Sequence, residues 1–196
     1  MLNHIQAALT SAEAALANLR KDTQTLAAVQ AAAERFVNVF ESGGRIFSCG
    51  NGGSMCDAIH FAEELSGRYR KDRRGLPAAA ISDPGHISCV ANDFGYDEIF
   101  SRYVQSHARK GDALLAISTS GQSPNVCKAA KVARDQAVTV VALTGKGNST
   151  LGKLADIEIC TPGGEFADRS QELHIKVIHI LIELIERSLF PQNYSE

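Results

Sequence analysis

The sequence predicts an α/β fold, a three-layer α-β-α sandwich built on a five-stranded parallel sheet. From Gly43 onward, short apolar runs alternate with segments of helical periodicity, which is the pattern of βαβ units with right-handed crossovers. Each run is bounded by Gly, Ser, Thr, Asn or Asp and is too short for a helix, so a strand is the better interpretation. The expected strands are residues 45–49, 77–81, 113–117, 138–143 and 157–160.

Two helices are expected before the first strand, over residues 3–20 and 23–41. Both segments are rich in alanine, lack Gly and Pro, and carry apolar residues at helical spacing. Because many of these apolar residues are small, the pair is suited to packing on another subunit. A last helix is expected over residues 168–190, just before Pro191. We therefore expect one domain, 1–196, with a helical extension (1–42) and an α/β core (43–196).

The composition is that of an ordinary globular protein and excludes several functional classes. Apolar residues make up 44% and charged residues 21% of the 196 positions, and the net charge is −2. A nucleic-acid-binding protein usually has a basic surplus, so we expect no nucleic-acid partner. No apolar run approaches the ~20 residues that span a bilayer, and the N-terminus does not resemble a signal peptide. The one basic cluster is interpreted mostly as a solvated loop and consists of Arg68, Arg70, Lys71, Arg73 and Arg74.

The five cysteines indicate a reducing compartment. They are odd in number, widely spaced and without a C-x-x-C pair, which argues against a disulfide framework and against a zinc knuckle. Buried, reduced thiols in a cytoplasmic protein are the simplest interpretation. The cysteines are Cys49, Cys56, Cys89, Cys127 and Cys160.

A hydroxyl-rich turn follows the expected strand at 113–117. Four side-chain hydroxyls fall within six residues, and a helical pattern begins directly after Pro124. Free backbone N–H groups and the helix dipole favour an anion at such a position, and hydroxyl donors can surround its oxygens without adding charge. The turn therefore suggests a small phosphorylated ligand. The hydroxyls belong to Ser118, Thr119, Ser120 and Ser123.

A glycine-rich turn follows the first expected strand, at residues 50–54. It resembles the start of a dinucleotide fingerprint, but Met55 stands where that pattern needs glycine. The phosphate-binding Walker pattern also fails, because no glycine lies five residues before Lys146. Two interpretations remain: a tight strand-to-helix turn, or glycines that let the backbone approach a sugar phosphate closely. The residues concerned are Asn51, Gly52, Gly53 and Ser54.

Two helical segments carry spaced polar residues that together are compatible with a metal site. His60 and Glu64 are four residues apart and share a helix face. Gln171 and His179 lie on one face of the last helix, in an otherwise apolar tract. Each pair by itself is more often a hydrogen-bonded structural feature, whereas both together could bind a divalent ion such as Zn²⁺. Asn92 and Asp93 are expected in a loop, as helix caps or as ligands of sugar hydroxyls.

Several long motifs, in order along the chain, resemble the phosphoheptose isomerases, a family with the sugar isomerase (SIS) fold. The resemblance covers almost the whole chain. It implies a cytoplasmic homotetramer with active sites shared between subunits. It also implies conversion of sedoheptulose 7-phosphate to D-glycero-D-manno-heptose 7-phosphate, the first step toward ADP-heptose for the lipopolysaccharide core. The motifs are SCGNGGS (48–54), HFAEELSGRYR (60–70), ISCVANDFGYDEIFSRYV (87–104), AISTSGQSPNV (116–126) and FADRSQELHIKVIHILIELIE (166–186).

The resemblance also implies roles for individual residues. Glu64 and His179 match a catalytic acid/base pair. Four residues match the ligands of a single zinc ion per subunit: His60, Glu64, Gln171 and His179. In a ketose–aldose isomerisation such a pair would move a proton between adjacent carbons. A residue that coordinates zinc through its lone pair is not also a free base, so the sequence leaves open whether the metal is catalytic or structural. The implied substrate-binding residues are Asn51, Gly52, Gly53, Ser54, Glu64, Arg68, Asn92, Asp93, Ser118, Thr119, Ser120, Ser123, Asp168 and Gln171.

A non-catalytic alternative has the same fold. The SIS protein that associates with the bacterial replication initiator also resembles the whole chain, including the ending Leu189-Phe190-Pro191. That relative lacks the residues that correspond to Glu64 and His179, and both are present here. The enzyme is therefore favoured over an adaptor, and also over a SIS sensor or an isomerase of another ketose phosphate.

Overall fold

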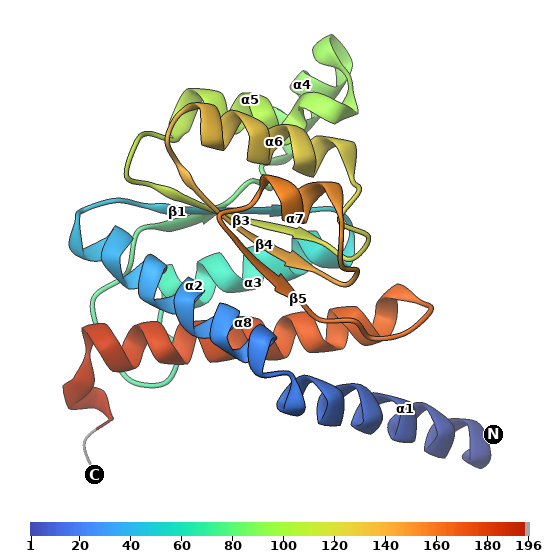
Figure 1. Cartoon of the computed structure of the whole chain (residues 1–196). Helices are drawn as coiled ribbons and strands as arrows, with labels where there is room; N and C mark the ends of the chain where they lie inside the picture. The colour runs from blue at the N-terminus through green and yellow to red at the C-terminus, as the bar shows by residue number, and fades with distance from the viewer. Residues whose placement is uncertain (195–196) are drawn as a thin grey trace.

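The computed structural model describes residues 1–194 and contains one five-stranded parallel sheet between two layers of helices (Figure 1). The strand order is β2-β1-β3-β4-β5. The predicted α/β sandwich is thus confirmed, with each strand within about one residue of its expected bounds. The strands are β1 (Ile46–Gly50), β2 (Ala78–Ala80), β3 (Ala113–Ser118), β4 (Thr139–Thr144) and β5 (Ile157–Cys160).

The central strands are buried on both faces, which explains their nearly continuous apolar sequence. All residues of β1 and β3 are buried. Successive side chains point to opposite faces of a sheet, so Leu115 and Ile117 enter one hydrophobic core while Leu114 and Ala116 enter the other. The apolar runs therefore supply both cores at once.

Each core is closed by its own layer of helices. The lower layer in Figure 1 packs on the face of Leu115 and Ile117, and the upper layer packs on the face of Leu114 and Ala116. The lower layer consists of α1 (Leu2–Lys21), α2 (Thr23–Glu41), α3 (Gly53–Ser66) and α8 (Ala167–Leu189). The upper layer consists of α4 (Pro84–Phe94), α5 (Ile99–His107), α6 (Pro124–Asp135) and α7 (Thr150–Leu154). Two short 3₁₀ helices are η1 (Tyr96–Glu98) and η2 (Pro191–Asn193).

The expectation of a loop at Asn92 and Asp93 is wrong, because both residues lie in the last turn of α4. The helix begins with Pro84 in its first turn and with the Asp83 carboxylate accepting from the backbone N–H of His86, a favourable start. It continues to Gly95, whose φ of 91° ends it. That conformation suits glycine alone among common residues.

The first helix packs on the body only near its C-terminal end. Ala15 and Leu19 of α1 are buried, whereas Leu2, Ile5 and Leu9 are exposed. In Figure 1 the N-terminal half of α1 extends away from the sheet. The helix therefore presents an unpartnered apolar stripe in a single chain. No helix within residues 1–194 is long and apolar enough to cross a membrane.

A buried ion pair joins α3 to α8. The guanidinium of Arg73 donates to the Glu186 carboxylate at 2.8 Å, and the two side chains are 1% and 0% exposed. Arg73 also donates to the backbone carbonyls of Glu64 and Leu65, at 2.7 and 2.8 Å, near the end of α3. The hydroxyl of Tyr194 donates to the other Glu186 oxygen at 2.8 Å. Arg73 is therefore an exception to the solvated basic loop that the sequence suggests.

Replacing Arg73 with Met is expected to destabilise the fold by about 3–5 kcal/mol, because Glu186 then keeps an unpaired charge in the core. The free energy of unfolding is measured in urea at a fixed protein concentration, so that subunit association does not shift the result. Lys71→Met, at an exposed position of the same segment, is the control and is expected to change stability by less than about 0.5 kcal/mol. Equal losses of stability in both variants would contradict a stabilising role for the Arg73–Glu186 ion pair.

Candidate functional site

The candidate site lies at the carboxyl ends of two neighbouring strands, β1 and β3. Strands β1 and β3 are paired in parallel, with Gly50 beside Ile117. The chain leaves β1 toward one edge of the sheet and β3 toward the other, and open parallel sheets bind ligands at such a switch point. The glycine-rich turn after β1 and the hydroxyl-rich turn after β3 therefore lie side by side and can contribute to one site.

The two turns are joined by a pair of amide side chains. Asn51 Nδ2 donates to Asn125 Oδ1 at 2.8 Å, and Asn125 Nδ2 donates back to Asn51 Oδ1 at 2.9 Å. The Tyr96 hydroxyl also donates to Asn51 Oδ1, at 3.2 Å. Asn125 is only 2% exposed, so it holds Asn51 in a fixed orientation at the end of β1.

The hydroxyls of the turn after β3 cluster around its centre. Ser118 Oγ lies 2.9 Å from Ser123 Oγ and 3.4 Å from Ser120 Oγ. Helix α6 begins immediately afterwards, with Ser123 as its N-cap. A pocket of about 180 Å³ adjoins the turn and is lined partly by Thr119, Ser120 and Lys146. Converging hydroxyls at a helix N-terminus, with a cation beside them, match the needs of an anionic group.

The start of α3 is fitted against the side chain of Gln171 on α8. A Cβ atom at Gly53 would lie 2.6 Å from Gln171 Nε2, so any other residue would displace the Gln171 amide. Gly52 is the N-cap of α3, and Ser54 in its first turn is 4% exposed. The Gln171 amide is therefore placed beside the glycine-rich turn.

Two imidazoles face each other between α3 and α8. His60 Nε2 lies 2.9 Å from His179 Nε2, although 119 residues separate them. Glu64, one turn after His60, brings Oε1 to 3.6 Å from the same His60 nitrogen. The helices run in parallel, since Gly53 meets Gln171 and His60 meets His179 further along. His60, Glu64 and His179 thus form one cluster.

The surroundings of this cluster shift the proton affinities of its members. Burial, and then the nearby Glu63 carboxylate, raise the pKa of Glu64 above its ordinary value. Burial, and then the neighbouring His60, lower the pKa of His179. Burial raises the pKa of Asp57, one turn before His60, to about 6. Perturbed groups gathered in one place are typical of sites that transfer protons.

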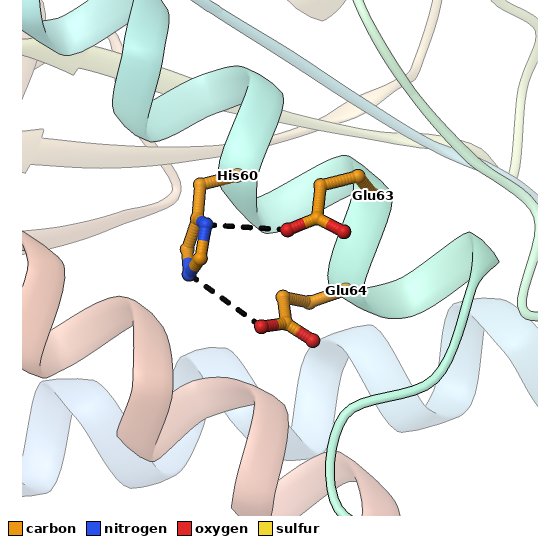
Figure 2. Close-up of side chains that lie close together, drawn as sticks. All are labelled: His60, Glu63 and Glu64. Atoms are coloured by element: carbon orange, nitrogen blue, oxygen red, sulfur yellow. Dashed lines mark ion pairs between the residues drawn. The ribbon is translucent and has the colours of Figure 1, made fainter. Parts of the chain in front are cut away.

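The same cluster fits a divalent metal ion. His60, Glu63 and Glu64 can each offer a ligand atom, all within 4.8 Å of one another. The close approach of two imidazole nitrogens from separate helices adds His179 as a further donor. Nitrogen and carboxylate oxygen are ligands that zinc accepts. Figure 2 shows the carboxylates of Glu63 and Glu64 at opposite ends of the His60 ring.

The remaining expected site residues lie outside this cluster in the single chain. Asn92 Nδ2 donates to Asp93 Oδ1 at 2.8 Å on the exposed end of α4, and Asp168 accepts from the backbone of Arg169 in the first turn of α8. Arg68 is exposed in the segment after α3. Across residues 1–194, no hydrogen bond or ion pair joins these four residues, or Gln171, to the imidazole cluster.

Sequence reasoning missed three residues of the site. Asn125 had a detectable signal, since it is a polar residue at a helix start, directly behind the hydroxyl-rich turn. Tyr96 had none, because its contact with Asn51 crosses 45 residues. Glu63 was hidden beside Glu64, and only the ring orientation of His60 shows that it has a separate contact.

Comparison with known proteins gives a consistent family. The SIS domain family matches residues 9–145. The phosphoheptose isomerases of Enterobacter sp. (strain 638) and Salmonella paratyphi B are each 58% identical over 181 residues, covering 92% of this chain and 94% of theirs.

Solved structures agree. Phosphoheptose isomerase GmhA from Neisseria gonorrhoeae superposes with a TM-score of 0.88 at 33% identity, covering 94% of this chain and 98% of its own. The phosphoheptose isomerase from Francisella tularensis gives 0.89 at 32% identity, covering 95% and 98%. The chain, with its SIS fold and its cluster of imidazoles and carboxylates, belongs to the phosphoheptose isomerase family.

Proposed function

We propose that this isomerase converts sedoheptulose 7-phosphate to D-glycero-D-manno-heptose 7-phosphate, the first step toward ADP-heptose and the lipopolysaccharide core. The observation that carries the proposal is the convergence of Glu64 and His179, from separate helices, on His60. Membership of the family supports the substrate, because its relatives are named for a phosphoheptose. A non-catalytic adaptor is not favoured, since it has no use for such a cluster.

The substrate phosphate binds at the turn after β3 in this proposal. Its oxygens accept hydrogen bonds from the hydroxyls of Ser118, Thr119, Ser120 and Ser123. The dipole of α6 favours the negative charge at its N-terminus. This anchor is remote from the reacting carbons, so its binding energy serves to orient C1 and C2. Asn51, held by Asn125, is positioned for the sugar hydroxyls.

Further residues complete the sugar site. Backbone groups of Gly52 and Gly53 line the sugar, with Ser54 and Gln171 beside them. This assignment is supported by the close approach of the Gln171 amide to Gly53. Four further residues are assigned to the part of the substrate site that is shared with a neighbouring subunit, because all four are exposed in the single subunit: Arg68, Asn92, Asp93 and Asp168.

Glu64 and His179 move the protons. Glu64 is the base that takes a proton from the carbon next to the carbonyl, and its raised pKa improves its basicity near neutral pH. His179, whose pKa is lowered, exchanges a proton with the substrate oxygens and does not remain charged. The proton on Glu64 then returns to the former carbonyl carbon, which completes the conversion of the ketose to the aldose.

One zinc ion per subunit is assigned to His60, Glu64, Gln171 and His179. When bound, the ion supplies a Lewis acid that stabilises negative charge on the substrate oxygens. The facing imidazole nitrogens support this set, and Gln171 would have to turn from Gly53 to join it. Glu64 has two carboxylate oxygens and His179 has two ring nitrogens, so coordination through one atom of each would leave the other for proton transfer.

The working protein is a cytoplasmic homotetramer with shared active sites. The apolar stripe of Leu2, Ile5 and Leu9 on α1 is exposed. A second apolar surface, a pocket of about 450 Å³ between α2 and α8, is lined partly by Leu26 and Ile180. Contiguous exposed apolar surfaces usually mark interfaces. Free cysteines support a reducing compartment.

The decisive assay incubates the purified protein with sedoheptulose 7-phosphate, with and without a metal chelator. We expect the aldose heptose phosphate to form, and the chelator to reduce the rate, with recovery on adding Zn²⁺. The product is followed by chromatography or by its anomeric NMR signals. Absence of aldose under every condition would contradict the proposed reaction, whereas full activity in chelator would contradict only a catalytic metal.

Glu64→Gln and His179→Gln are each expected to lower kcat by about 10²–10⁴-fold, the range for loss of a general acid or base. The fold and the binding of the sugar phosphate should survive, because the phosphate anchor is untouched. Turnover is measured together with ligand binding by calorimetry. Undiminished turnover in either variant would remove that residue from the mechanism.

Ser120→Ala is expected to raise KM by about 10-fold with little change in kcat, since one hydrogen bond to a charged phosphate contributes about 1.5–3 kcal/mol. Steady-state kinetics give both constants. Ser106→Ala, on the exposed end of α5, is the matched control. An unchanged KM in Ser120→Ala would place the phosphate elsewhere.

A further inference from the structure

Glu63 makes a contact that the proposed reaction does not use. Its Oε1 lies 3.2 Å from Nδ1 of His60, while Glu64 and His179 approach Nε2 of the same ring. Figure 2 shows the two carboxylates reaching opposite ends of the imidazole from successive positions on α3. The two ring nitrogens of His60 therefore have different neighbours.

The chemistry of imidazole gives this arrangement a consequence. A neutral histidine has one N–H and one lone pair, and the hydrogen bond at one nitrogen decides which nitrogen has the proton. An ionised carboxylate can only accept. The Glu63 carboxylate, 3.2 Å from Nδ1, is closer to the ring than the Glu64 oxygen, 3.6 Å from Nε2, so the proton is favoured on Nδ1 and the Nε2 lone pair faces His179.

We propose that Glu63 is a positioning residue that fixes His60 in the Nδ1–H tautomer, so that Nε2 presents its lone pair to the cluster. Without a metal, that lone pair accepts a hydrogen bond from the Nε2–H of His179 across 2.9 Å. With a metal, the same lone pair is the ligand. Carboxylate–histidine–metal arrangements orient the ring and raise the basicity of the ligand nitrogen. The part that concerns a metal rests on the zinc set proposed above.

Glu63 could instead only stabilise α3 through an ion pair with His60, and such a role would have different measurable effects. Residues three apart on a helix commonly form ion pairs, and Glu63 is 58% exposed, so such a pair adds little to stability. A helical pair would alter the melting temperature slightly and leave the tautomer and the metal affinity unchanged. Direct ligation is a second alternative, but Glu63 lies at the ring nitrogen opposite to the one that His179 faces.

Zn²⁺ affinity of the metal-free protein separates these roles, measured by competition with a chromogenic chelator. Glu63→Ala is expected to weaken binding by about 10–100-fold, the usual effect of losing such a partner. Glu63→Gln keeps a neutral acceptor for Nδ1–H and is expected to lose less. Glu41→Ala, at the exposed end of α2, should bind as the original chain does. If Glu63 were itself a ligand, Glu63→Gln would lose as much as Glu63→Ala.

The tautomer itself is read from imidazole ¹⁵N NMR of the metal-free protein at about pH 8, above the ordinary pKa of histidine. His60→Gln identifies the His60 signals. We expect protonated Nδ1 and unprotonated Nε2 in the original chain, and a mixture of tautomers in Glu63→Ala. An Nε2–H tautomer in the original chain, or no change in Glu63→Ala, would overturn the proposal. Failure of the original chain to bind Zn²⁺ would count against the metal set alone, because the tautomer is measured without metal.

Discussion

The arrangement of the site depends on the contact between the parallel helices α3 and α8. One helix carries His60 and Glu64, and the other carries Gln171 and His179. Arg73 fixes their relative position at one end, because its guanidinium binds both the last carbonyls of α3 and the Glu186 carboxylate of α8. Such a pair has little freedom to slide, since each displacement would leave a buried charge unpaired.

In the proposed reaction, the strand ends bind the substrate phosphate and sugar, and the helices of one layer transfer the protons. The turns after β1 and β3 are set by the ends of neighbouring strands, and the Asn51–Asn125 amide pair joins them. The imidazole cluster instead depends on the helices of one layer. In the proposed reaction, a rigid anchor for the phosphate and a separately held proton-transfer group are both available before the substrate arrives, so little binding energy is spent on ordering the site.

The electrostatics of the cluster follow from placing similar groups together in a half-buried space. Glu63 and Glu64 are adjacent carboxylates, and His60 and His179 are adjacent imidazoles. Burial, and then the like neighbour, raise the pKa of Glu64 and lower that of His179. A divalent cation would reverse the penalty on ionised Glu64, because it attracts the carboxylate, and it would bind the neutral imidazole that the lowered pKa of His179 already favours.

The sequence alone determined what depends on local periodicity. Apolar runs too short for helices located the strands, and the four-residue spacing of His60 and Glu64 placed them on one helix face. Turn chemistry located the hydroxyl-rich loop. Only the tertiary structure decided the contacts between distant segments: the His60–His179 approach, the Asn51–Asn125 pair and the burial of Arg73. Periodicity fixes the direction of a side chain on its own element, whereas these contacts depend on how separate elements pack.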